Sequence, residues 1–172
     1  MRSLFGSTAT SFAILAFLLC MPLEAQATPG EVVISQVHTL GGNATSTWRN
    51  DYVELFNRSG APVSLSGWSL QATQANNGTT WIKGNLPSVT LSPGQFFLMQ
   101  FGSSGSGGVL LSPAGDATMT LNSGNSKIAL MRTTNQIAAG TACPIGDPDL
   151  ADFVGIATAN CFEGAATAPA NG

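Results

Sequence analysis

The sequence predicts an all-β protein that folds as an antiparallel β-sandwich. Short apolar or alternating runs recur along the chain, and turn-forming residues separate them about every ten residues. No helical periodicity of apolar residues follows residue 28. The 172 residues are 44% hydrophobic and 9% charged, which provides enough apolar material for the core of one domain.

Residues 1–27 are expected to be a cleaved secretory signal peptide. Arg2 precedes an uncharged run that contains the apolar stretch 12–21, and Ala25-Gln26-Ala27 fits the small-x-small rule for cleavage before Thr28. An uncleaved anchor is the alternative, but the apolar stretch is well short of the roughly 20 residues that a membrane span needs. The sequence therefore predicts a secreted or periplasmic protein with no membrane span after cleavage.

Two cysteines, Cys143 and Cys161, remain after this cleavage. An even pair in a chain that reaches an oxidising compartment predicts one disulfide, with two free thiols as the alternative. Closing a loop of this size stabilises a fold by about 3 kcal/mol in the chain-entropy model.

The first expected strand runs from residue 31 to residue 38, and residues 39–50 are an expected loop. Strict alternation in this strand places Ser35 and Val37 on the face opposite to Ile34.

Residues 51–57 are expected to form the first central strand. Val53 and Leu55 point to the core, and the opposite face carries Tyr52, Glu54 and Phe56. If that face is open, these three residues are a candidate partner-docking face. A buried Glu54 would instead need a partner such as Arg58 or Lys127, because an unpaired buried carboxylate is costly.

Residues 57–62 are expected to be a hairpin connection, and residues 63–70 its return strand. Strict alternation would turn Leu65 and Trp68 to opposite faces. A bulge is therefore predicted at Gly67, with Trp68 buried.

The remaining turn signals predict two more hairpins, of which the first contains Pro93-Gly94 in a type II turn. The glycine-rich run 102–108 is expected to be a mobile loop, because it has no side chain that could pack. The other predicted pieces are an edge strand at 81–83, hairpin limbs at 89–91, 95–101, 117–121 and 127–132, and a last strand at 151–156. The sandwich is expected to span 28–165, followed by a disordered Ala- and Pro-rich tail, 166–172.

Five segments, in the same order, resemble the lamin tail domain family, an immunoglobulin-like sandwich found in nuclear lamins and in bacterial secreted proteins. The segments are Ile34-Ser35-Gln36-Val37, Asp51-Tyr52-Val53-Glu54-Leu55-Phe56-Asn57, Leu65-Ser66-Gly67-Trp68-Ser69-Leu70, Leu91-Ser92-Pro93-Gly94-Gln95 and Ser126-Lys127-Ile128-Ala129-Leu130. The resemblance implies an immunoglobulin-like antiparallel β-sandwich. The end of the chain, 152–155 and 159–164, is similar to the version at the front of bacterial extracellular nucleases of the endonuclease/exonuclease/phosphatase superfamily.

The resemblance implies a secreted, non-catalytic binding or targeting module for a protein or cell-surface partner. The alternative is the accessory front domain of an extracellular nuclease whose catalytic domain is missing from this chain. A downstream reading frame that encodes a nuclease domain would favour the alternative.

The residues predict no catalytic group, no metal site and no cofactor. His38 is the only histidine, and Asp51 and Glu54 point to opposite faces of their strand, so they cannot act as a carboxylate pair. An acidic group near the end has the oxygen ligands that calcium selects, but its spacing does not match an EF-hand. Its members are Asp147, Asp149, Asp152 and Glu163.

The net charge of -3 disfavours nucleic-acid binding by this chain alone, because phosphate contacts need clustered cations. Trp48 and Trp81, in or beside polar loops, are candidate exposed aromatic contacts for a protein or a sugar. The alternative is that both rings cap the ends of the sandwich.

Overall fold

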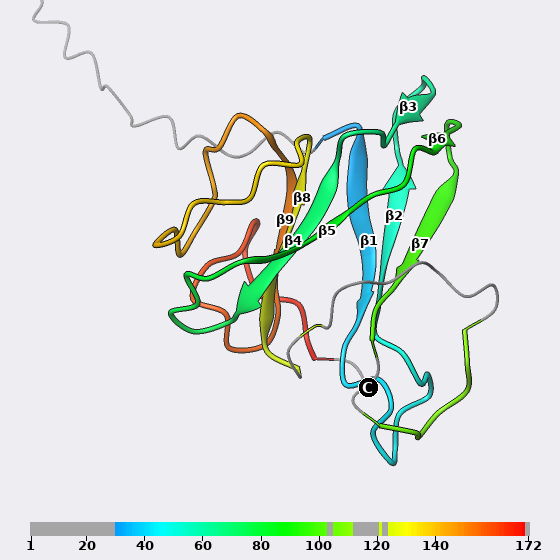
Figure 1. The fold of residues 1–172 in the computed structure, drawn as a ribbon, viewed down its shortest axis with the longest axis vertical. Coiled ribbons are helices and arrows are strands. Elements are labelled where there is room, and N and C mark those ends of the chain that lie inside the picture. The colour runs from blue at the N-terminus through cyan, green and yellow to red at the C-terminus, as the bar shows by residue number, and fades with distance from the viewer. Residues whose placement is uncertain (1–29, 103–104, 112–120, 122–123, 171–172) are drawn as a thin grey trace, which may run out of the picture.

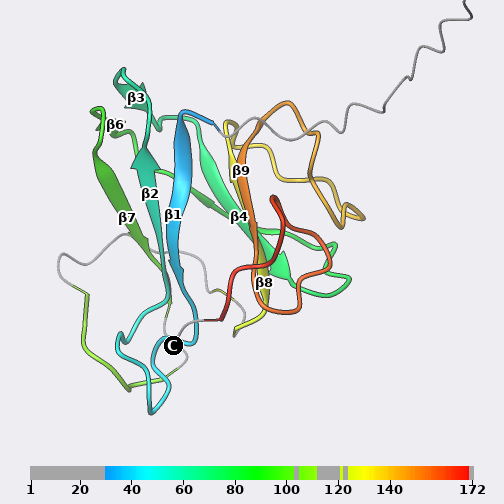
Figure 2. The same ribbon diagram turned by 180° about the vertical axis from the view of Figure 1, so that it is seen from behind.

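The computed structural model describes residues 30–102, 105–111, 121 and 124–170. The strands in these residues pair antiparallel in sheets of order β1-β2-β7, β3-β6 and β5-β4-β8-β9 (Figures 1 and 2), which confirms the predicted all-β sandwich. The strands are β1 (Val32–His38), β2 (Tyr52–Asn57), β3 (Val63–Ser64), β4 (Ser69–Gln74), β5 (Ile82–Asn85), β6 (Thr90–Leu91), β7 (Phe96–Gln100), β8 (Ser126–Met131) and β9 (Leu150–Gly155).

The main core lies between the three-stranded and the four-stranded sheet. Val53 and Leu55 of β2 are fully buried in it, as alternation predicts. Leu70 of β4 and Ile128 of β8 belong to the same cluster from the other sheet. Trp68 also belongs to it, so its predicted burial is confirmed.

β1 departs from strict alternation because it contains a bulge. Its pairing with β2 shifts register between Ile34 and Gln36. The extra residue, Ser35, lets Ile34 and Val37 both pack against the main core, although strict alternation would separate them. The bulge also directs the Ile34 N–H to the Asp152 carboxylate of β9, 2.6 Å away, which ties the two sheets together.

Gly67 forms a turn, and the predicted bulge at this position is wrong. The Leu65 carbonyl accepts the Trp68 N–H at 3.1 Å, and Gly67 has a φ of 80°. That positive φ suits glycine at the third position of a type II turn. The expected strand 63–70 is therefore two strands, since β3 pairs with β6 whereas β4 pairs with β5 and β8.

The turns at 57–62 and 92–94 exist, but they do not join paired strands. Gly94 has a φ of 75°, and the Gln95 N–H donates to the Ser92 carbonyl at 3.0 Å, so the predicted type II turn is confirmed. The expected hairpin pairing is wrong, because β2 pairs with β7 and β3 pairs with β6. Segments 52–64 and 90–100 thus form a two-stranded ribbon (Figure 1). The pairing is interrupted between β2 and β3 on one strand and between β6 and β7 on the other, where the two turns lie.

The remaining strand predictions are confirmed where the structure describes them. β5 is the expected edge strand, β8 is the second limb of the third hairpin, and β9 is the expected last strand. The first limb of that hairpin, 117–121, lies outside the described residues except for residue 121.

The segment that follows β8 and contains Thr133, Asn135 and Ile137 covers the outer face of the four-stranded sheet; we call it the covering segment. Polar side chains of β4 hold the backbone of this segment. The Ser69 hydroxyl donates to the Thr133 carbonyl at 2.7 Å, and the Gln71 side chain bonds the Asn135 carbonyl and the Ile137 N–H, both at 2.8 Å. The covering segment encloses a second core cluster, which consists of Trp81, Ala129, Met131, Ile137, Leu150, Phe153 and Cys161.

Lys127 and a disulfide also hold the covering segment and its neighbouring loops in place. The buried Lys127 ammonium donates to the carbonyl oxygens of Gly78 at 3.1 Å and Ala142 at 2.6 Å, and to Asn160 Oδ1 at 3.2 Å. Burial lowers the pKa of Lys127. The Cys143–Cys161 disulfide, with Cα atoms 5.7 Å apart, closes the loop that contains β9.

The glycine-rich run, expected to be a mobile loop without packing side chains, contacts the loop 39–50 through its backbone in the described residues 105–108. The Gly107 N–H donates to the Gly42 carbonyl at 2.8 Å. A Cβ on Gly107 would lie 2.0 Å from the Asn43 carbonyl oxygen. These glycines permit two backbones to touch, which a larger residue would prevent.

In the described part of the expected disordered tail 166–172, which reaches residue 170, Ala168 is hydrogen-bonded to the end of β9 and the residues that follow it. The Ala157 N–H donates to the Ala168 carbonyl at 2.7 Å, and the Ala168 N–H donates to the Gly155 carbonyl at 2.8 Å. The expected signal peptide, 1–27, lies outside the described residues.

His38 and Asp51 fasten the loop 39–50 near its two ends. His38 Nε2 lies 3.2 Å from Ser46 Oγ, and Asp51 Oδ1 accepts the Gly41 N–H at 2.7 Å. Burial lowers the pKa of His38. Burial also raises the pKa of Asp51 from 3.8 to about 6, against the opposing effect of the Gly41 hydrogen bond.

We expect Asp51→Asn to flatten the pH dependence of stability. Folding raises the pKa of Asp51 to about 6. Its favourable contribution to the free energy of unfolding is therefore complete below about pH 4 and is lost as pH rises through 6. Asparagine keeps the acceptor for Gly41 and resembles the protonated acid. The variant should match the wild type at about pH 3 and exceed it at pH 8 by about 2 kcal/mol in urea unfolding. Equal stabilities at pH 8 would contradict this assignment.

Candidate functional site

The outer face of the three-stranded sheet carries the three residues that the sequence nominates for docking. The register aligns three cross-strand rows on this face, and each row takes one residue from β1, β2 and β7. The rows are Val33–Phe56–Phe96, Gln36–Glu54–Leu98 and His38–Tyr52–Gln100. The face therefore changes along the strands from aromatic and aliphatic to polar.

Phe56 forms the exposed aromatic end of this face together with Phe96. Their ring centroids are 4.5 Å apart, and Phe96 is 55% exposed. Cross-strand aromatic pairs of this kind stabilise a sheet. Exposure on that scale for a phenylalanine leaves a large apolar surface in water.

Glu54 lies at the centre of the face and is half-buried. Its Oε1 accepts the hydroxyl of Ser35 at 2.7 Å. The bulge in β1 supplies this partner, which sequence alternation did not indicate. Lys127 is buried on the other sheet, so its expected pairing with Glu54 is wrong.

Tyr52 is the one residue of the predicted docking face that is buried. It is 6% exposed and stacks on His38, with 5.3 Å between ring centroids. Its membership of an open docking surface is therefore wrong, and the accessible part of the face is centred on Phe56, Phe96 and Leu98. Phe96 and Leu98 were recognised in the sequence only as strand residues, because their proximity to Phe56 depends on the pairing of β7 with β2.

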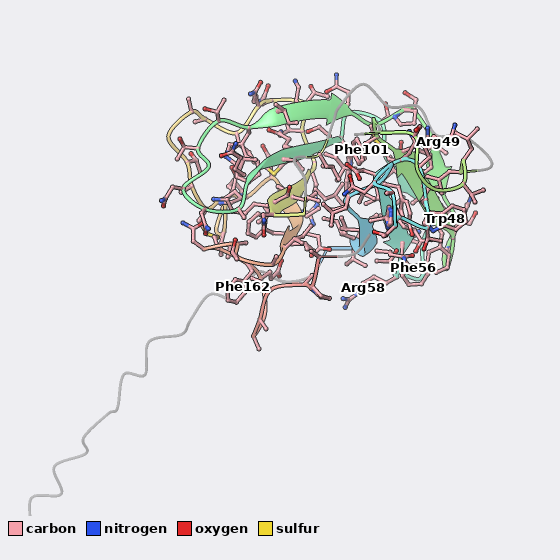
Figure 3. All side chains as sticks on the ribbon, turned by 90° about the horizontal axis from the view of Figure 1, so that it is seen from below. Trp48, Arg49, Phe56, Arg58, Phe101 and Phe162 are labelled. Carbon is pink, nitrogen blue, oxygen red and sulfur yellow. A yellow bond between two sulfur atoms is a disulfide. The ribbon has the colours of Figure 1, made fainter. Side chains whose placement is uncertain are left out.

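Trp48 lies at the loop end of the molecule and is half-exposed. Viewed along the strands, Trp48 and Phe56 lie on the side of the three-stranded sheet, whereas Phe162 lies towards the four-stranded sheet (Figure 3). Trp48 forms an isolated bridge with Val109, which is 65% exposed.

Trp81 is buried, so it is not an exposed aromatic contact, which was one of the two alternatives for this ring. It is 1% exposed and belongs to the second core cluster under the covering segment. Its Nε1–H donates to the Thr141 carbonyl at 2.8 Å. A local polar context suggested exposure, but a segment about 60 residues later in the chain covers the ring.

The acidic residues near the end of the chain separate into two places. Asp147 Oδ1 accepts the Asp149 N–H at 2.9 Å within one turn. Asp152 lies in the seam between β1 and β9, where burial raises its pKa and the nearby Arg58 opposes that shift. Burial and the Asp152 charge raise the pKa of Glu163. Among the described residues, no three His, Cys, Asp or Glu side chains gather as a metal-binding group.

The comparison with known protein families matches the Lamin Tail Domain model over residues 25–142, well over half of the chain. The chain belongs to the lamin tail domain family. The lamin tail domain is an immunoglobulin-like fold, in agreement with the antiparallel sandwich described above. The matched residues end just before Cys143, so β9 and the disulfide lie beyond them.

A search of curated proteins found no significant match to this lamin tail domain protein. In the described part of the chain, no helix has the length and apolar character needed to cross a membrane.

Proposed function

We propose that this lamin tail domain protein is a secreted or periplasmic, non-catalytic binding module of the bacterial type. The observation that carries the proposal is the ring pair on a sheet face in which Phe96 is 55% exposed and Phe56 is half-buried. Apolar aromatic surface of this kind is typical of protein interfaces. The Cys143–Cys161 disulfide is consistent with export, because such bonds persist in oxidising compartments.

The distribution of basic groups favours a protein or cell-surface partner over a nucleic acid. Lys127 is buried, Arg132 donates to the Leu150 carbonyl at 2.7 Å and lies over Trp68, and Lys83 donates to the Thr134 carbonyl. Phosphate binding instead needs cations clustered on one surface. The buried position of His38 likewise supports a non-catalytic role.

Site-specific photocrosslinking tests the docking face. A photoreactive phenylalanine at Phe96 should crosslink the exported protein to a partner of different mass on cells of the source organism. The same residue at Ile82, an exposed apolar position at the edge of the other sheet, is the matched control. Equal crosslinking at both positions, or none at Phe96, would contradict the proposed face.

N-terminal sequencing tests the proposed export and cleavage. The protein recovered outside the cytoplasm should begin at Thr28 by N-terminal sequencing. Recovery of the intact amino terminus in the membrane fraction would show an anchored protein instead.

A further inference from the structure

β7 is the edge strand of the three-stranded sheet. Within the described residues it pairs with β2 on one side and with no strand on the other. Figures 1 and 2 show it as the outermost strand of this sheet in both views.

The outward backbone groups of β7 follow from its ladder with β2. The Phe101 N–H donates to the Asp51 carbonyl at 2.7 Å, and the Asn57 N–H donates to the Gln95 carbonyl at 3.0 Å. Odd-numbered residues of this segment therefore direct their backbone groups towards β2. Because the direction alternates in an antiparallel ladder, the N–H and C=O groups of Phe96, Leu98 and Gln100 point to the open edge.

In the part of the chain that the structure describes, this edge lacks the features that usually prevent strand pairing. Natural edges are protected by charged side chains, proline, bulges or covering segments. Segment 95–101 has no charged residue and no proline, and its register with β2 is unbroken. The edges of the other sheet differ, since β5 carries Lys83 and the end of β9 is extended by Ala168.

Gln100 provides a second observation at the same edge. Its Oε1 is buried and has no hydrogen-bond partner among the described residues. Buried polar atoms usually have partners, and an unpaired one needs an explanation.

We propose that β7 pairs antiparallel with β7 of a second copy of this chain, joining two three-stranded sheets into one. A twofold axis at Leu98 would place Phe96 opposite the partner's Gln100 and satisfy both rows of outward backbone groups together. No charge on either strand opposes this approach. The inference goes beyond the proposed function, because it uses the backbone edge of the sheet and leaves the outer face available to another partner.

Hydrogen exchange and molecular mass test this pairing on the exported protein. Light scattering should show a shift from monomer to dimer as concentration rises. At the dimer concentration, the amides of Phe96, Leu98 and Gln100 should exchange about tenfold or more slowly than in dilute solution. The inward amides of Phe97 and Met99 should be protected at both concentrations. A monomer mass throughout, or unchanged exchange at the three outward amides, overturns the proposal.

Two edge variants distinguish this interface from others. Phe96→Lys places a charge on the exposed edge and should abolish the dimer, and Ile82→Lys places the same charge on the edge of the other sheet and should not. Leu98→Pro removes an outward N–H and should also give a monomer. Far-ultraviolet circular dichroism checks folding, and the charge variants decide the outcome if the proline variant unfolds. A dimer that survives Phe96→Lys, or is lost in Ile82→Lys, overturns the proposal.

Discussion

Replacing Asn57 by alanine is expected to lower the free energy of unfolding by about 3 kcal/mol. Asn57 is fully buried at the end of β2. Its Nδ2 donates to the carbonyls of Ala61 at 2.8 Å and Leu91 at 2.9 Å, and its Oδ1 accepts the backbone N–H of Ser59 at 3.0 Å. Alanine would leave these backbone groups without their partner where the two-stranded ribbon is interrupted.

Urea unfolding of three variants measures this effect. Asn57→Asp keeps the acceptor for Ser59 but removes both donors, so it should be destabilised by a similar amount. Asn85→Ala, at an exposed position at the end of β5, is the matched control and should change stability by less than about 0.5 kcal/mol. A loss below about 1 kcal/mol in Asn57→Ala would show that the loops hold their shape without it.

Removing the disulfide, by combining Cys143→Ser with Cys161→Ser, is expected to cost about 3 kcal/mol. The bond closes the loop that contains β9 and holds the layer that covers Trp81. Its loss should therefore loosen the second core before the main core. Tryptophan fluorescence should shift to the red, and β9 amides should lose more exchange protection than β2 amides.

Reduction supplies the control for the disulfide variant. A reducing agent should lower the stability of the wild type to that of the double variant and leave the double variant unchanged. Uniform loss of protection over β2 and β9 would contradict the separate role of the covering segment. A change below about 1 kcal/mol would contradict the stabilising role of the bond.

The alternation of residues predicts most of the strands but not which strands pair. Val53 and Leu55 face the core because side chains alternate along a strand, and this holds whatever lies beside β2. Gly67 was correctly identified as a special backbone position. Whether it forms a bulge or a turn depends on whether the next residues stay in the same sheet, and local sequence carries no signal for that choice.

The candidate site was predicted in part for the same reason. Phe56 and Glu54 share a face by alternation, but the ring that pairs with Phe56 comes from β7, and the hydroxyl that binds Glu54 comes from the bulge in β1. Tyr52 also lies on that face, yet stacking on His38 removes it from solvent. These contacts join residues from different strands, so they follow from register.

The all-β class, the family resemblance, the cysteine pair and the inward face of β2 could be predicted before the fold was known, because each depends on residue type or on spacing within one segment. Three other facts emerge from the folded chain alone: Trp81 is buried, Lys127 binds a carbonyl of the covering segment, and β7 lies at the edge of its sheet. Those facts depend on segments distant in the chain, whose meeting is a property of the folded protein as a whole.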